Sequence, residues 1–142
     1  MRVIPDTNVW IAWLAAAPRS LELGAHGRAW VLVSTIALQE LWAGAQLESQ
    51  RADCERLFQT ARLRDRLVNP PIAAWILAGQ TLALLARRGR LGPARLRALR
   101  NDVLLAATAW AHEAAVMTHN RADFRTIAEV LPVRVVEPGG DP

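Results

Sequence analysis

The chain has 142 residues, 52% of them apolar, which suffices for one domain with a buried core. Cys54 is the only cysteine, which excludes an intrachain disulfide and a cysteine-cluster zinc site, and no apolar run approaches the roughly 18 residues of a membrane helix, so a soluble, cytoplasmic protein is expected. The net charge of +4 favours a polyanionic partner such as nucleic acid, but all 17 basic residues are Arg, a bias that a GC-rich genome would also produce.

Short apolar segments of strand length alternate with longer helical patterns along the chain. The first strand is predicted at Val3–Ile4 and the first helix from about Asn8 to Ala17, with Asp6 or Thr7 placed to cap it. The next elements are predicted as a strand at Trp30–Val33, a helix from Ser34 or Thr35 to about Leu47, a charged amphipathic helix at Arg51–Arg66 and a weak strand at Leu67–Val68.

The second half continues the alternation. It is predicted to contain a helix from Ile72 to about Arg88, a helix from Pro93 to about Glu113, a strand at Ala115–Thr118, a short helix at Arg121–Val130 and a strand at Val133–Val136. Residues 1–137 are expected to form one domain, with residues 138–142 as a flexible C-terminal tail. This alternation predicts a three-layer α/β/α fold whose sheet has four to five mainly parallel strands.

Four acidic residues lie in apolar runs where a charge is the exception: Asp6, Glu40, Asp102 and Asp123. Asp6 and Asp123 follow predicted strands, at the edge where sites of open α/β sheets form, and the other two lie on apolar helix faces. Burying an unpaired carboxylate costs several kcal/mol, so such acids normally hold a cation or titrate. Taken singly, each also fits a helix cap or a surface ion pair. Together they predict a metal-dependent hydrolase.

The chemistry of the four acids points to one class of ion and one class of reaction. An all-oxygen ligand set favours Mg²⁺ or Mn²⁺ over zinc. Hydrolysis of a phosphodiester needs activated water and neutralised phosphate charge, both of which such ions supply. Hydrolysis of this kind is expected to leave a 5′-phosphate and a 3′-hydroxyl.

Four motifs carry a family resemblance, in this order: residues 4–9 (IPDTNV), 34–41 (STIALQEL), 101–109 (NDVLLAATA) and 117–124 (MTHNRADF). With these motifs the chain resembles PIN-domain ribonucleases, specifically the VapC-type toxins of type II toxin–antitoxin systems, over residues 2–136. The resemblance implies an Mg²⁺- or Mn²⁺-dependent endoribonuclease that a small antitoxin neutralises and that forms a homodimer. A non-catalytic PIN module that binds RNA or acts as a scaffold is the alternative.

The resemblance also assigns roles to residues. Asp6, Glu40 and Asp102 match the three acids of the family's metal site, and either Asp123 or the amide of Asn120 completes it. Thr7 and Thr118 are similar to the family's supporting hydroxyls.

Arginines gather before the Asp102 motif, and His119 lies beside the fourth motif. Arg95 and Arg97 are candidate RNA contacts within a cluster that also contains Arg87, Arg88, Arg90 and Arg100, although a solvated helix end explains the cluster equally well. His119 is a further candidate for contact with a phosphate. Trp10, Trp13 and Trp42 are expected in the core, with an exposed apolar surface as the alternative.

Overall fold

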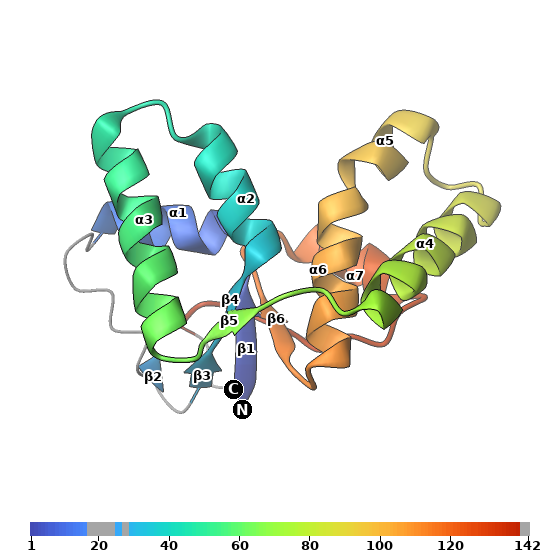
Figure 1. The fold of residues 1–142 in the computed structure, drawn as a ribbon. Helices are drawn as coiled ribbons and strands as arrows, with labels where there is room; N and C mark the ends of the chain where they lie inside the picture. The colour runs from blue at the N-terminus through green and yellow to red at the C-terminus, as the bar shows by residue number, and fades with distance from the viewer. Residues whose placement is uncertain (17–24, 27–28, 140–142) are drawn as a thin grey trace.

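The computed structural model describes residues 1–16, 25–26 and 29–139. Fourteen elements lie within these ranges (Figure 1). They are β1 (Arg2–Pro5), α1 (Thr7–Ala16), β2 (Ala25–His26), β3 (Ala29–Val31), β4 (Val33–Ser34), α2 (Thr35–Gly44), α3 (Glu48–Leu63), β5 (Leu67–Val68), α4 (Ile72–Arg87), α5 (Pro93–Ala98), α6 (Arg100–Ala111), β6 (Ala115–Met117), α7 (Arg121–Ala128) and β7 (Val135–Val136).

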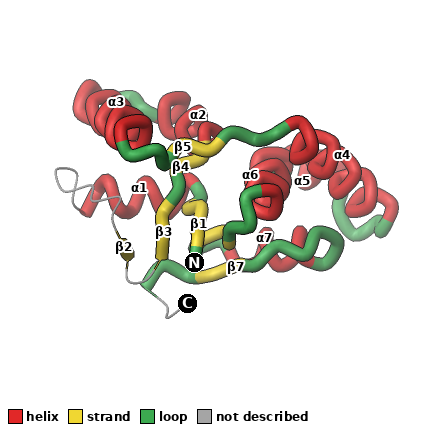
Figure 2. The backbone as a smooth tube through the Cα atoms, turned by 60° about the horizontal axis from the view of Figure 1, so that its bottom comes forward, coloured by secondary structure: helices red, strands yellow, loops and turns green. Residues whose placement is uncertain are grey.

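The main sheet has five strands in the order β2-β3-β1-β6-β7, all parallel to their neighbours except β2, which runs antiparallel to β3. Helices α1, α2 and α3 lie to one side of this sheet, and α4, α6 and α7 lie to the other (Figure 2). The predicted three-layer fold with four to five mainly parallel strands is therefore confirmed.

Side chains that alternate along the central strands fill two separate cores, one on each face of the sheet. Val3 packs with the α1, α2 and α3 side, whereas its neighbour Ile4 packs with the α4, α6 and α7 side. In β6, Val116 joins the core of Ile4, while Ala115 and Met117 join the core of Val3. Burial on both faces is what the nearly continuous apolar composition of these strands predicts.

The predicted strand at Trp30–Val33 is two strands, because the chain changes partners at Leu32. The amide of Leu32 donates to the Val3 carbonyl at 2.8 Å, within the main sheet. The next amide, that of Val33, donates to the Arg66 carbonyl at 2.8 Å, and β4 then pairs with β5 in a separate two-stranded sheet. An apolar run that is continuous in sequence thus serves two sheets.

The predicted helix from Pro93 to Glu113 is also two helices. Leu99 separates α5 from α6, and its side chain is almost completely buried in the core beneath them. Strand β2 was not predicted, because a two-residue strand leaves no pattern in the sequence. The predicted end of the first helix at Ala17 lies outside the described residues, as does most of the predicted tail at 138–142.

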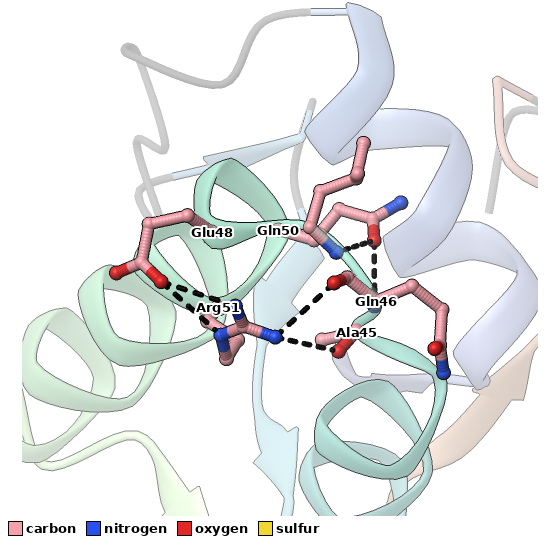
Figure 3. Close-up of polar contacts among 6 residues, drawn as sticks. Ala45, Gln46, Glu48, Gln50 and Arg51 are labelled. Carbon is pink, nitrogen blue, oxygen red and sulfur yellow. Dashed lines mark hydrogen bonds and ion pairs between the residues drawn. The ribbon is translucent and has the colours of Figure 1, made fainter.

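The turn between α2 and α3 explains why both helix boundaries differ from the prediction (Figure 3). The Gln50 side-chain oxygen accepts hydrogen bonds from the amides of Gln46 and Leu47, at 2.9 and 3.0 Å. Arg51 donates to the carbonyls of Ala45 and Gln46. These bonds satisfy backbone groups that a longer α2 would use, so α2 ends at Gly44 and α3 begins at Glu48.

The expectation for the tryptophans is wrong at Trp42, whose side chain is 42% exposed because it lies on the outer face of α2. Trp10 is fully buried and Trp13 is half-buried beside it, with ring centroids 5.3 Å apart, as expected. No helix within the described ranges combines the length and the hydropathy that crossing a membrane requires.

Candidate metal centre

Three of the four predicted acids line a single cleft of about 430 Å³. Each comes from a different element: Asp6 directly follows β1, Glu40 lies in α2, and Asp102 lies in the first turn of α6. Because β1 is a central strand, the cleft lies beyond the carboxyl edge of the sheet, where sites of parallel α/β sheets are found. Thr7 and Asn101 line the same cleft.

Asp6 is buried, with 4% of its surface exposed, and both carboxylate oxygens have partners. The Val9 amide donates to Oδ1 at 3.0 Å, so Asp6 caps α1 as the sequence predicts. The Thr118 hydroxyl donates to Oδ2, and the Asp6 amide donates to the Met117 carbonyl at 2.9 Å. Two neighbouring strands and the start of α1 thus fix the position of this carboxylate.

Glu40 is tied to both sides of the cleft. The Thr7 hydroxyl donates to Glu40 Oε2, and the Asn101 side-chain amide donates to Oε1 at 2.6 Å. Thr7 therefore contacts one of the predicted metal ligands directly. Asn101 was not predicted as a site residue, because its only sequence signal is its place beside Asp102 in the third motif and its partner Glu40 lies 61 residues away.

The Asp102 carboxylate carries the clearest electrostatic signal of the site. Burial, followed by the negative charges of Glu40 and Asp6, raises the pKa of Asp102 to about 6, while Arg95 lowers it. The ionised form of Asp102 is therefore disfavoured by burial and by the two neighbouring carboxylates. A bound cation would favour the ionised form, and the carboxylate oxygens are of the type that Mg²⁺ and Mn²⁺ prefer.

The donor set fits a hard divalent ion in its chemistry, but the ligands are not gathered around one point. Across residues 1–16, 25–26 and 29–139, no three Asp, Glu, His or Cys side chains have the arrangement of a formed metal site. The carboxylates of Asp6 and Glu40 instead accept hydrogen bonds from the hydroxyl and amide donors around them. Binding of one ion by all three residues would require their carboxylates to approach a common point within the cleft.

Asp123, the fourth predicted acid, is buried in the first turn of α7 and does not line the cleft. Its Oδ1 pairs with Arg95, and its Oδ2 accepts a hydrogen bond from the Asn120 side chain at 2.6 Å. The backbone amide of Asn120 donates to the Thr118 hydroxyl oxygen at 2.8 Å. Asp123 is thus linked to Asp6 through the side chain and backbone of Asn120 and the hydroxyl of Thr118.

The arginines of the predicted basic cluster divide into two groups. In the first group, Arg95 forms an ion pair with Asp123, and its charge also lowers the pKa of Asp102. Arg88 and Arg90 both pair with Glu129, at 3.0 and 3.7 Å. Arg87, Arg97 and Arg100 are exposed and form no ion pair within the described part of the chain. His119 is also exposed, so it is available to solvent beside Thr118.

The known proteins most informative for this chain are PIN domains. The sequence profile of the PIN domain matches residues 3–130. No curated protein sequence is significantly similar to the chain.

Among solved structures, three similar ones are VapBC proteins, and each aligns over nearly the whole chain. VapBC2 from Rickettsia felis, bound to a DNA fragment from the promoter, has 22% identity and a TM-score of 0.68, covering 96% of this chain and 98% of that one. VapBC-1 from nontypeable Haemophilus influenzae has 19% identity and a TM-score of 0.67, covering 99% of this chain and 100% of that one. VapBC-5 from Mycobacterium tuberculosis, from the VapBC family of toxin–antitoxin systems, has 21% identity and a TM-score of 0.63, covering 96% and 98%.

At identities near 20% these structural matches establish the fold, while the profile match covers most of the sequence independently. The mainly parallel sheet with helices on both faces agrees with that match. This chain therefore belongs to the PIN-domain family.

Proposed function

We propose that this protein is an endoribonuclease that depends on Mg²⁺ or Mn²⁺ and is the toxin of a toxin–antitoxin pair. The observation that carries the proposal is the cleft shared by Asp6, Glu40 and Asp102, in which burial, and then the charges of Glu40 and Asp6, raise the pKa of Asp102. Membership of the PIN family, whose domains are generally nucleases, supports the reaction class. The likeness to VapBC structures supports the toxin assignment.

In this proposal Asp6, Glu40 and Asp102 would hold the cation, which would activate water and offset charge on the phosphate when bound. The protein's own contribution is to orient the ligands. Thr118 and the Val9 amide hold Asp6, and Thr7 and Asn101 hold Glu40. Groups that orient metal ligands typically change metal affinity or activity about 10- to 100-fold when they are removed.

The proposed partners are an RNA substrate, a small antitoxin protein and a second copy of the chain. Exposed apolar side chains, including Trp42 and Trp110, leave surface for protein contacts. Light scattering of the purified chain at micromolar concentrations is expected to report a dimer, and a monomer throughout would remove the homodimer from the proposal.

The nuclease proposal is tested by incubating the purified protein with total RNA and Mg²⁺ or Mn²⁺, with EDTA as the control. Sequencing of the fragment ends is expected to map discrete cuts that carry 5′-phosphates and 3′-hydroxyls and that EDTA abolishes. Products that end in 2′,3′-cyclic phosphates, or cleavage that persists in EDTA, would contradict the proposed mechanism.

A non-catalytic RNA-binding PIN module is the second candidate. It is favoured by one observation: the Asp6 and Glu40 carboxylates are engaged by hydrogen bonds rather than gathered as a metal site. In the same experiment this candidate predicts RNA binding with no cleavage under any metal.

The role of Asp123 is tested by Asp123→Asn. Because Arg95 and Asn120 already occupy both oxygens of Asp123, the substitution is expected to slow RNA cleavage by about tenfold, as for a residue that orients ligands. Initial cleavage rates at saturating Mn²⁺ measure the effect. A loss as large as that of Asp6→Asn would instead make Asp123 a direct ligand that must release Arg95.

A further inference from the structure

A second groove of about 520 Å³ lies beside the metal cleft and shares part of its wall. The two share Ile36, Gln39 and Asn101 as lining residues. The remaining wall comes mainly from α4, with Trp75 and Leu82, and from Arg100 at the start of α6. A ligand that fills the groove would therefore extend from the site of the proposed reaction.

The groove offers an aromatic face with open space in front of it. Trp75 is 60% exposed although it lines the groove, and it makes no ring contact with another described aromatic side chain. Gly79, one turn along α4 on the same wall, has no atom within 4 Å of the position where a Cβ would stand. The helix surface beside the indole is thus open at Gly79.

Polar groups border this apolar wall. Arg100 lines the groove, is exposed and has no anionic partner within the described residues. The Gln39 side chain is also exposed, at the boundary between groove and cleft. A flat aromatic surface next to an unpaired guanidinium and an amide is the combination that binds a base together with its phosphate.

We propose that this groove binds the nucleotide next to the scissile phosphate in single-stranded RNA. Trp75 stacks on the base, and Arg100 binds the adjoining backbone phosphate. The inference rests on the proposed function, since it places the base relative to the metal cleft. It makes Trp75 and Arg100 the residues that position the RNA and influence which sequence is cut.

Two other exposed apolar residues of α4 help to distinguish a nucleotide site from an interface between protein chains. Ile72 and Ile76 are 83% and 59% exposed on the same helix, but neither lines the groove. An interface between protein chains would use these isoleucines together with Trp75. A nucleotide in the groove would use Trp75 without them. Two features favour the nucleotide: the groove shares part of its wall with the metal cleft, and Arg100 is unpaired within the described residues.

The experiment measures binding of a labelled single-stranded oligoribonucleotide of about ten nucleotides by fluorescence anisotropy. The protein carries Asp6→Asn so that the RNA stays intact. Adding Trp75→Ala is expected to weaken binding about tenfold, because stacking on one aromatic side chain contributes this much or more, whereas Trp75→Phe keeps most of the affinity. Arg100→Ala is expected to make the slope of log affinity against log salt concentration shallower, by the amount that corresponds to about one phosphate contact. The matched control, Ile76→Ala, is expected to bind as the parent does.

Equal affinity of the parent and of Trp75→Ala would overturn the inference, as would failure of the parent to bind RNA. Equal weakening by Trp75→Ala and Ile76→Ala, with a change in mass by light scattering, would also overturn it and identify an interface between chains. Because binding is measured without cleavage, these outcomes are independent of the nuclease assay on the unsubstituted protein, which alone decides the proposed function.

Discussion

Replacing Asp6 by Asn is expected to lower the rate of RNA cleavage about a thousandfold, the largest effect of any single substitution considered. The amide keeps the size of the carboxylate, and its oxygen can still accept the hydrogen bond from the Val9 amide. The substitution therefore preserves the cap of α1 while it removes one negative charge from the cleft. Loss of a charged metal ligand removes several kcal/mol of transition-state stabilisation.

The control for this substitution is Asp65→Asn. Asp65 is exposed at the end of α3 with φ of 52°, a left-handed conformation that Asn adopts readily, so the net charge changes equally without effect on the cleft. Initial cleavage rates at saturating Mn²⁺, together with thermal melting of both variants, separate lost chemistry from lost folding. Residual activity of Asp6→Asn within tenfold of the unsubstituted protein would contradict the assignment of Asp6 as a ligand.

Replacing Asp102 by Asn is expected to stabilise the metal-free protein at pH 8 by about 1–2 kcal/mol, after allowance for solvent screening. Burial and the charges of Glu40 and Asp6 raise the pKa of Asp102 to about 6, from its ordinary value of 3.8. Between these two pH values the folded chain holds a proton that the unfolded chain has lost. The penalty for the ionised group is therefore absent below pH 3.8, grows as pH rises and is complete above pH 6.

Urea unfolding in EDTA between pH 4 and pH 8 measures this effect. The gain from Asp102→Asn is expected at pH 8 and to disappear near pH 4. Added Mn²⁺ is expected to reverse the ranking at pH 8, because a bound cation favours the ionised carboxylate. Equal unfolding free energies of the two proteins at pH 8 in EDTA would show that ionised Asp102 does not destabilise the folded protein.

The parts of the fold that the sequence predicted depend on local signals. Asp6 was recognised because a strand, a cap and a helix follow one another within a few residues, and its bond to the Val9 amide is one of those local contacts. Glu40 and Asp102 were recognised because helical periodicity identifies the inward face of a helix without any knowledge of its neighbours.

The parts that were missed depend on contacts between distant segments. Asn101 reaches Glu40 across 61 residues, and Arg95 reaches Asp123 across 28, so no local pattern reveals either bond. The exchange of partners at Leu32 has the same origin, since Arg66 supplies the carbonyl that draws Val33 into a second sheet. Exposure of Trp42 likewise follows from where the other helices pack rather than from its own neighbours in sequence.

The central claim is that the carboxylates of Asp6, Glu40 and Asp102 turn toward one cleft and bind a divalent cation. Anomalous diffraction from a crystal of the full chain grown with Mn²⁺ tests it most directly. The predicted result is a single strong anomalous peak, or a close pair of peaks, in contact with oxygens of all three residues. Saturating Mn²⁺ with no peak in this cleft, or with peaks only elsewhere on the protein, would contradict the claim.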